Sequence, residues 1–472
     1  MWFTRSTYSL FTSFLLVLLI SQVCARSISG DRLLIIDEGE LRNNYKAYIW
    51  DLEQRGFQLT YLSPKSPELE LFSYGERKWD HLLLLPPKSK AYGPKLTSQL
   101  LVEFLNKDGN ILVLQDPMNT PEQLRDLAWE LEIGLAPKGD VVVDHFNWLP
   151  GVEGNDHSHN VILAKKPVTG PLTKNYFGGY NNQEEYVAFR GTGHTLRNSP
   201  LIQPFLQAPR TAYVYDPREE TVKSENPWTA GQQLYLASGF QARNNARITF
   251  VGSAESFNDE FQGLDGLRKG PYGQKVNISN RRFANDVTAW TFKETGVVKV
   301  WSVAHYATKD AGNLSRRNTS ESPSIYRIKT DVTFEITLSE YAMDRWIPFQ
   351  LPLNDSLQLE FTMLDPYYRL NLVPTVTSVN STTFSVNFIV PDQHGIFAFR
   401  INYKRPYITY IDEKIQVTLR HMAHNEWTRS YAISGSWVWL GGLASTVIGW
   451  VAFVALWLYS VPRETKVAAK KQ

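Results

Sequence analysis

The feature that most constrains this chain is a long apolar stretch close to its C-terminus. No charged residue occurs between Arg429 and Arg463. A helix over the core of this stretch, residues 437–459, would rise about 1.5 Å per residue and cross a bilayer interior roughly 30 Å thick. Aromatic residues typical of membrane interfaces stand at both edges: Trp437, Trp439, Trp457 and Tyr459. We therefore expect a transmembrane helix over residues 433–460.

Positive charge gathers after this stretch, in residues 461–472. Arg463, Lys466, Lys470 and Lys471 all lie there. Cytosolic flanks carry an excess of lysine and arginine, so we expect this tail in the cytosol and everything before residue 430 in the lumen. Lys470 and Lys471 also resemble the dilysine retrieval signals of endoplasmic-reticulum membrane proteins. One residue follows the pair instead of the usual two, so a basic flank that only stops transfer is the alternative.

Small residues recur every fourth position inside the apolar stretch, at Gly441, Ser445 and Gly449. They share one face of a helix and would let a second membrane helix approach closely. A subunit of a complex needs such a face, whereas a lone anchor does not. The alternative is that small residues are simply common in membrane helices.

The N-terminus has the pattern of a secretory signal peptide over residues 1–25. Arg5 precedes an apolar run at residues 14–20, and the small-residue exit ends at Ala25, after which we expect cleavage. An uncleaved anchor is the alternative. The only cysteine is Cys24, so the mature chain would hold no disulfide, no thiol nucleophile and no cysteine-based metal site. Five Asn-X-Ser/Thr sequons are candidate glycan acceptors: Asn277, Asn313, Asn318, Asn354 and Asn380.

The lumenal part begins with strands and helices in alternation. Short apolar runs at 33–36, 57–62, 81–85 and 111–114 predict strands, and residues 41–55, 94–107 and 121–132 have helical spacing. Such alternation predicts a parallel, Rossmann-like sheet covered on both faces in an N-terminal α/β domain, residues 26–140. A second α/β unit is expected over 141–306, with strands at 141–143, 212–215, 248–251 and 297–303 and a helix at 281–294.

The region nearest the membrane has a different pattern. Residues 307–323 are rich in Asn, Ser and Arg and predict a linker. Apolar and polar residues then alternate at 331–338, 357–363, 383–390, 396–403 and 414–419. Several short alternating strands predict an immunoglobulin-like β-sandwich over residues 324–429.

Recognisable catalytic motifs are missing from the sequence, and the net charge of +2 gives no indication of nucleic-acid binding. Asp37 and Asp116 each follow a predicted strand, at the edge where open α/β sheets bind ligands. They could perform acid–base work on a sugar, or simply cap the following helices. His145, His157 and His159, beside Asp144 and Asp156, suggest either a metal site or an exposed polar loop.

A further polar cluster lies directly before the strand predicted at 248–251. It comprises Gln241, Arg243, Asn244, Asn245 and Arg247. These donors could hold a carboxylate, phosphate or sugar. The alternative is a polar turn whose arginines pair with nearby acids.

The chain resembles the forty-eight-kilodalton subunit family of oligosaccharyltransferase, whose fungal members are wheat-germ-agglutinin-binding proteins. The resemblance covers nearly the whole length and rests on pieces in the same order: residues 144–147, Phe189-Arg190-Gly191-Thr192-Gly193, residues 241–247, Phe292-Lys293-Glu294-Thr295-Gly296-Val297, Leu357-Gln358-Leu359-Glu360-Phe361 with Asp365-Pro366, and Pro391-Asp392 with Gly395-Ile396-Phe397. The signal peptide, single span and basic tail agree with it.

This resemblance implies a role in N-linked glycosylation in the endoplasmic reticulum. The complex transfers a preassembled oligosaccharide from dolichol diphosphate to Asn of Asn-X-Ser/Thr in nascent chains. Catalysis would belong to a multi-spanning subunit, and a ribophorin-like and a small multi-spanning subunit would be further partners. This chain would have no catalytic residue, metal or cofactor, would help assembly, and could contact glycan or acceptor. An autonomous lumenal glycosidase using Asp37 and Asp116, or a glycan-binding cargo receptor, are the alternatives.

Overall fold

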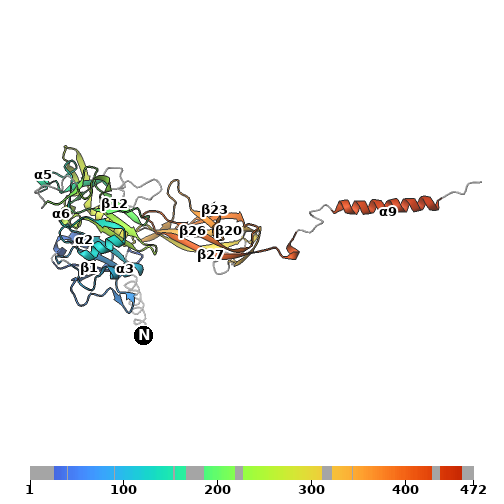
Figure 1. Ribbon diagram of the computed structural model, residues 1–472, viewed down its shortest axis with the longest axis horizontal. Helices are drawn as coiled ribbons and strands as arrows, with labels where there is room; N and C mark the ends of the chain where they lie inside the picture. The colour runs from blue at the N-terminus through green and yellow to red at the C-terminus, as the bar shows by residue number, and fades with distance from the viewer. Residues whose placement is uncertain are drawn as a thin grey trace, which may run out of the picture.

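The computed structural model describes residues 26–39, 41–89, 91–152, 155–165, 185–217, 227–310, 322–342, 344–427 and 436–459. Three parts follow one another along the chain (Figure 1). A head of mixed α/β structure extends to about residue 296, a unit built of strands follows, and a single long helix comes last. The predicted signal peptide and basic tail lie outside the described residues.

The head is organised around a large sheet with five adjacent parallel strands. Their order is β2 (Gln58–Leu62), β1 (Arg32–Ile36), β5 (His81–Leu84), β6 (Asn110–Leu114) and β15 (Arg247–Val251). Most of these strands are continuous apolar runs, because both faces of a parallel sheet are covered. Successive side chains of β1 accordingly enter different cores: Leu33 and Ile35 enter one, Leu34 and Ile36 the other.

Helices cover the two faces of this sheet. On one face α2 (Lys46–Gln54) and α7 (Asn280–Thr291) contribute Leu52 and Trp290 to the core. On the other, α3 (Ser98–Asn106) and α4 (Glu122–Glu130) contribute Phe104 and Leu127. The amphipathic spacing seen in the sequence therefore directs each helix onto the sheet.

The same sheet continues beyond β15 with antiparallel strands. These are β14 (Tyr235–Gln241), β11 (His194–Leu196) and β7 (Ile133–Leu135), with β12 (Ile202–Gln207) paired to β14. Strand β15 pairs with β6 along its length, from Ile248 opposite Ile111 to Val251 opposite Leu114. The expected division into separate α/β units at residue 140 therefore does not describe the sheet, which joins strands from both ranges.

Smaller elements complete the head. A second sheet has the order β16-β17-β10-β9, and β13 pairs with β8 and β3 with β4. Their bounds are β3 (Phe72–Ser73), β4 (Glu76–Arg77), β8 (Val141–Val143), β9 (Ile162–Lys165), β10 (Glu185–Phe189), β13 (Tyr213–Tyr215), β16 (Gly266–Lys269), β17 (Lys275–Ile278), α5 (Asn155–Ser158) and α6 (Asp259–Gln262).

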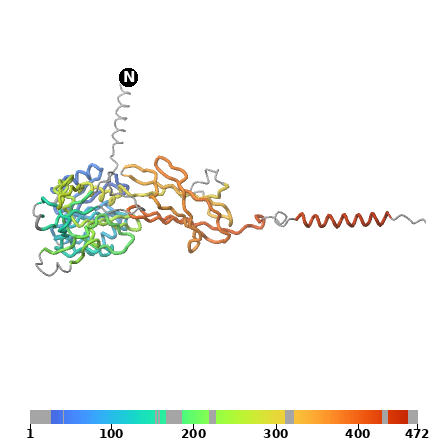
Figure 2. The backbone as a smooth tube through the Cα atoms, turned by 90° about the horizontal axis from the view of Figure 1, so that it is seen from above, coloured from blue at the N-terminus to red at the C-terminus, as the bar shows by residue number. Residues whose placement is uncertain are grey.

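The unit that follows the head lies between the head and the last helix (Figure 2). Two five-stranded sheets form it. One contains β18 (Val297–Ala307), β20 (Asp331–Ala342), β25 (Thr382–Ile389) and β24 (Val373–Thr377), with β21 (Arg345–Pro348) beside β20. The other contains β19 (Ile325–Arg327), β27 (Ile411–Arg420), β26 (Gly395–Tyr403), β22 (Gln358–Thr362) and β23 (Pro366–Asn371). Both contribute to one core, in which Phe334 packs on Phe399.

One strand that was expected in the second α/β unit belongs instead to the strand-rich unit. The run at 297–303 was expected to end the second α/β unit, but β18 extends to Ala307 and pairs antiparallel with β20. The boundary before the strand-rich unit therefore lies near Gly296, ahead of the predicted linker at 307–323. The pairing partner lies far along the chain, which local patterning cannot reveal.

The last described element is α9 (Trp437–Leu458), a 22-residue helix. It would be about 33 Å long. It is the one described helix whose length and apolar composition suffice to cross a membrane. Its large apolar side chains are exposed, including Trp439 and Leu443, which suits a lipid environment.

Candidate functional site

A cavity of about 410 Å³ lies where the parallel strands of the head end. Its wall comes from the segments that follow four of these strands, and includes Tyr45, Lys88, Asp116 and Glu255. The volume falls within the range of small-molecule sites, roughly 300–1,000 Å³. We take this carboxyl-edge cavity as the candidate functional site.

The topology of the sheet explains the position of the cavity. Strand β1 has β2 on one side and β5 on the other, so the chain reverses its direction of travel across the sheet between them. Loops leave on opposite faces at such a switch point and open a crevice at the carboxyl ends. Asp37 and Asp116, the candidate carboxylates predicted from the sequence, were expected at this edge for the same reason.

The side chain of Gln115 offers the clearest binding group in the cavity. Gln115 directly follows β6, lines the cavity, and is only 2% exposed. Neither Nε2 nor Oε1 of its amide has a hydrogen-bond partner among the described residues. A buried polar group left unpaired costs about 1–3 kcal/mol. A ligand with both donors and acceptors could satisfy this amide.

Asp116, the next residue, combines a structural and an electrostatic role. Its Oδ2 accepts a hydrogen bond from Asn119 Nδ2 at 2.7 Å, and its carbonyl accepts one from Thr120 Oγ1 at 2.8 Å. These bonds shape the turn before α4, but Asp116 does not cap that helix, whose N-cap is Pro121 without a side-chain cap. Burial raises the pKa of the Asp116 carboxyl, so the group ionises less readily than a surface aspartate.

Asp37 lies at the same edge, but outside the wall of the cavity. Its Oδ1 is buried without a partner among the described residues. Strands β1 and β6 lie on either side of β5, so Asp37 and Asp116 follow strands separated by roughly 9.6 Å. Burial, together with the charges of Glu255, Asp116 and Asp37, raises the pKa of the Tyr45 hydroxyl. The geometry thus gathers carboxylates around Tyr45 rather than forming a close carboxylate pair.

The motif at residues 189–193 forms the opposite wall. Arg190 Nε forms an ion pair with Glu255, and both residues line the cavity. Behind them two chain segments cross at Gly191 and Gly252. A Cβ on Gly191 would lie 2.2 Å from the Gly252 oxygen, and one on Gly252 would lie 2.0 Å from the Thr192 oxygen. Only glycine allows this close backbone approach.

Replacing Gly191 by alanine should therefore destabilise the head. The methyl group would meet backbone rather than a flexible side chain. Overpacking of this kind costs about 1–3 kcal/mol. Thermal unfolding of the purified chain should show a lower midpoint, whereas Gly442→Ala, on the helix α9 with no atom within 4 Å of the added methyl group, serves as the control. An unchanged midpoint for Gly191→Ala would contradict the close crossing.

Together these groups favour a polar ligand. The wall offers amide groups from Gln115, Asn119 and Asn160, together with the paired charges of Arg190 and Glu255. Amides and paired charges bind hydroxyl and amide groups by hydrogen bonding. Gln115 was not predicted from the sequence, because no local pattern distinguishes a buried amide without a partner from a surface glutamine.

The polar cluster at residues 241–247 joins the head to the strand-rich unit. Arg247 is fully buried and donates to the carbonyls of Trp290, Thr295 and Gly296 at 2.6–2.9 Å. Gln241 supports it, because Gln241 Oε1 accepts from Arg247 Nε at 3.1 Å.

The same cluster holds the loop between β26 and β27. Gln241 Nε2 donates to the Ile408 carbonyl at 2.9 Å, and Asn245 Oδ1 accepts from the Tyr410 amide at 2.7 Å. Asn244 Nδ2 donates to the Leu105 carbonyl, and Arg243 is exposed. Most of the cluster therefore bonds to backbone, in place of the expected acids.

The histidine candidates come together only in part. His145 Nδ1 and His159 Nδ1 are 2.6 Å apart, and His145 Nε2 lies 3.0 Å from the Tyr213 hydroxyl. Asp144 instead accepts hydrogen bonds from the Phe146 and Asn147 amides. The side chains of Asp156 and His157 lie outside the described residues, and within the described ones no cluster of potential metal ligands occurs.

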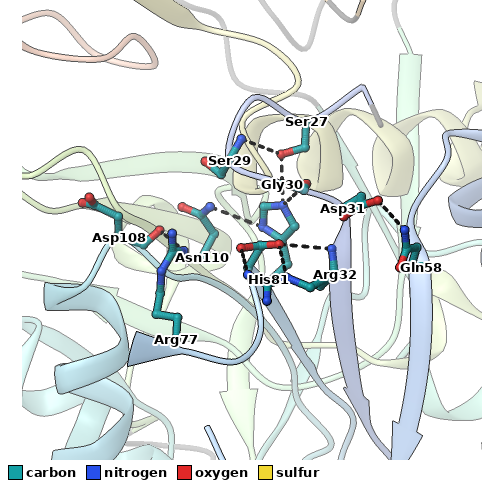
Figure 3. A network of polar contacts seen from close by, with 11 residues as sticks. Ser27, Ser29, Gly30, Asp31, Arg32, Gln58, Arg77, His81, Asp108 and Asn110 are labelled. Atoms are coloured by element: carbon teal, nitrogen blue, oxygen red, sulfur yellow. Dashed lines mark hydrogen bonds and ion pairs between the residues drawn. The ribbon is translucent and has the colours of Figure 1, made fainter. Parts of the chain in front are cut away.

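A buried histidine, His81, anchors the N-terminal segment (Figure 3). His81 Nε2 lies 3.0 Å from Ser27 Oγ, and Ser27 Oγ donates to the Phe292 carbonyl at 2.6 Å. Asn110 Nδ2 lies 3.3 Å from His81 Nδ1. Burial lowers the pKa of His81 to about 3, so the ring stays neutral and serves as a hydrogen-bonding link. The described chain thus begins with residues packed into the head.

The sequons differ in accessibility. Asn354 and Asn380 are exposed in turns, whereas Asn277 is half-buried within β17. Asn313 and Asn318 lie outside the described residues, as do Lys470 and Lys471. Gly441, Ser445 and Gly449 all lie on α9, with no atom near the Cβ position of either glycine.

Comparison with known proteins gives consistent matches along the chain. The family model for the N-terminal domain of OST48 matches residues 24–294, and that for the OST48 middle domain matches residues 314–461. The dolichyl-diphosphooligosaccharide–protein glycosyltransferase subunit wbp1 of Schizosaccharomyces pombe is 33% identical, covering 91% of this chain and 92% of its own.

Two further relatives show similar coverage. The Saccharomyces cerevisiae subunit WBP1 is 30% identical over 89% of each chain. The 48 kDa subunit of Caenorhabditis elegans is 29% identical over 96% of this chain and 97% of its own. The chain belongs to the OST48 family.

Proposed function

We propose that this chain is a subunit of the oligosaccharyltransferase complex and acts in N-linked glycosylation without supplying the catalytic residues. The observation that carries the proposal is the near full-length similarity to proteins named as dolichyl-diphosphooligosaccharide–protein glycosyltransferase subunits. The complex transfers oligosaccharide from dolichol diphosphate to asparagine. The partners of this chain within the complex are a multi-spanning catalytic subunit, a ribophorin-like subunit and a small multi-spanning subunit.

The geometry of the head supports an accessory role. Asp116 shapes a turn, and Asp37 follows a strand two positions away in the sheet. The strands that these residues follow are roughly 9.6 Å apart, wider than the carboxylate pair of a retaining glycosidase, about 5–5.5 Å. The wider pair of an inverting glycosidase, about 6.5–9.5 Å, is tested by the hydrolysis assay below. The carboxyl-edge cavity instead contacts glycan or acceptor through amides and paired charges. The head is Rossmann-like, and the strand-rich unit is an immunoglobulin-like sandwich beside the membrane.

We assign the chain to the endoplasmic-reticulum membrane as a type I protein. Removal of residues 1–25 leaves the head and the strand-rich unit in the lumen, α9 crosses the bilayer, and the basic tail lies in the cytosol. The exposed Asn354 and Asn380 carry glycans, and Lys470 with Lys471 acts in retrieval. Protease added to sealed microsomes should spare the head and remove only the tail.

The function is tested by pull-down and depletion together. The tagged chain, recovered in detergent, should bring down the catalytic subunit as read by mass spectrometry. Depletion should leave secretory glycoproteins under-glycosylated. Recovery without the catalytic subunit, with loss of particular cargo only, would favour a cargo receptor. Glycan hydrolysis by the purified chain, lost in Asp37→Asn, would favour a glycosidase.

The small-residue face of α9 makes a separate prediction. Replacing Gly441, Ser445 and Gly449 by leucine should keep α9 in the membrane, because leucine suits lipid, yet block close approach of a partner helix. Recovery of the catalytic subunit should fall, while alkaline extraction still leaves the chain in the membrane. Leucine at Val447, Val451 and Val454, which lie on the opposite side of α9, is the control. Undiminished recovery of the complex would contradict this face.

A further inference from the structure

A second, larger cavity lies between the head and the strand-rich unit. Its volume is about 1330 Å³, above the range typical of small-molecule sites, and its wall shares no residue with the carboxyl-edge cavity. The head contributes residues 199–202 and Arg243, and the strand-rich unit contributes the start of β18 and the loop between β26 and β27. We call it the junction cleft.

Positive charge dominates the wall of the junction cleft. Six basic side chains line it: Arg243, Lys293, Lys299, Arg400, Lys404 and Arg405. Three acidic side chains line it as well: Glu132, Asp412 and Glu413. Arg400 pairs with Asp412 at 3.4 Å, and Arg405 pairs with Asp355. With these pairs set aside, four cations remain, Arg243, Lys293, Lys299 and Lys404, against the two acids Glu132 and Glu413.

Lys293 is the member of this group that most needs a ligand. It is 7% exposed, and its backbone is in the left-handed region with φ of 58°. Within the part of the chain that the structure describes, no hydrogen bond or ion pair reaches its ammonium group. Burial and the charge of Arg247 lower the pKa of Lys293 to about 8. The ammonium nitrogen is not fully enclosed, so it reaches the cleft that Lys293 lines and is open to an anionic partner there.

The location of the cleft indicates which kind of anion fits. The loop between β26 and β27 lies at the head, whereas the chain leaves the sheet for α9 after Arg420, at the other end of β27. Strands of this length span about 30 Å. A phosphate group at the bilayer surface would therefore be one strand length away. Thr409 already occupies the outward backbone groups of Val298 at the start of β18, so recognition in the cleft falls to its charged side chains, and the size of the cleft suits an extended chain.

We propose that the junction cleft binds a carboxylate-rich segment of a partner polypeptide. Carboxylates of an extended segment would pair with Lys293 in the depth of the cleft and with Arg243 and Lys404 at its exposed rim. The site is separate from the carboxyl-edge cavity and does not depend on what that cavity binds.

The test uses the full chain in detergent and a fluorescein-labelled peptide of ten glutamates, followed by anisotropy at low salt. Arg243→Gln and Lys404→Gln should each weaken binding by roughly two- to fivefold. Lys293→Met should weaken it by more than about tenfold, because a buried charge contact is lost. Lys329→Gln, which removes an exposed lysine on the strand-rich unit outside the cleft, should bind as the unaltered chain does.

Two results would overturn the proposal. Equal peptide affinity in Arg243→Gln, Lys404→Gln and the unaltered chain would exclude the cleft as the site, even if Lys293→Met fails to fold. Absence of peptide binding, together with binding of phosphatidic acid vesicles or inorganic diphosphate that the same variants weaken, would assign the cleft to phosphate instead.

Discussion

Arg247→Met should unfold the junction between the head and the strand-rich unit and lower the stability of the chain by at least about 3 kcal/mol. The guanidinium donates to three backbone carbonyls, of Trp290, Thr295 and Gly296. It also lies over the Trp290 ring, 4.5 Å from its centroid. Methionine fills part of the volume but donates nothing, and each buried carbonyl left unpaired costs about 1–3 kcal/mol.

The effect should be visible in both stability and domain association. Thermal unfolding of the purified chain should occur roughly 6–12 °C lower. Limited proteolysis should cut near residue 296, since the Gly296 carbonyl loses its donor. Arg243→Met, an exposed change in the same turn, should leave the midpoint unchanged within about 0.5 kcal/mol. Equal behaviour of the two variants would show that the buried arginine contributes little.

Arg55→Met should destabilise the head by about 3–5 kcal/mol at neutral pH, because it leaves the buried carboxylate of Glu294 without its cationic partner. Arg55 Nη1 pairs with Glu294 Oε1 at 3.1 Å, and the two side chains are 10% and 2% exposed. Burial raises the pKa of Glu294 even with Arg55 present. Without the arginine, that pKa should rise further.

This destabilisation should depend on pH in a defined direction. The folded pKa of Glu294 lies above its ordinary value of 4.5. The folded state therefore holds the proton more tightly than the unfolded state, and stability falls as pH rises from 4.5 through the folded pKa. Denaturant midpoints of Arg55→Met should thus approach those of the unaltered chain in acid and fall away at neutral pH.

A second substitution isolates the charge. Arg55→Met combined with Glu294→Gln should recover much of the lost stability and show a weaker pH dependence, because no carboxylate remains to be buried. Arg420→Met, which breaks the exposed pair with Glu426, should barely move the midpoint. A loss in Arg55→Met that is equal at every pH would assign the effect to packing instead.

Local elements of the fold were predictable wherever burial leaves a pattern in the sequence. The predicted strand at 141–143 coincides with β8, and the apolar run at 111–114 differs from β6 by one residue. The predicted helix at 41–55 is in fact a short 3₁₀ turn followed by α2, because Tyr45 interrupts it in a non-helical conformation. Periodicity detects a face but not a local break in the backbone.

Pairing between distant strands was not predictable in this way. An apolar run such as 248–251 is compatible with a strand in a separate sheet and with a strand added to an existing sheet. Nothing in the local sequence therefore indicated that β15 pairs with β6. The same holds for β18, whose first residues look like the end of an α/β unit until their pairing with β20 is known. Register depends on contacts that sequence spacing does not encode.

The candidate site was predictable in position but not in chemistry. Asp37 and Asp116 marked the correct edge of the sheet, because ligand crevices follow strand topology. The side chains that line the cavity come from segments far apart in the sequence, and Arg190 and Glu255 meet only after folding. For the cluster at 241–247, composition indicated donors, whereas their partners are backbone carbonyls that no composition specifies.

The hydrogen bond that anchors Ser27 limits how early in biosynthesis the head can be completed. Its hydroxyl bonds to the Phe292 carbonyl, 265 positions later in the chain. A ribosome adding about 5–20 residues per second needs roughly 13–53 s to cover that interval. Ser27 must therefore wait until Phe292, near the end of the head, has been translated before its partner exists. The head can close only late in translation, whatever the speed at which its central sheet assembles.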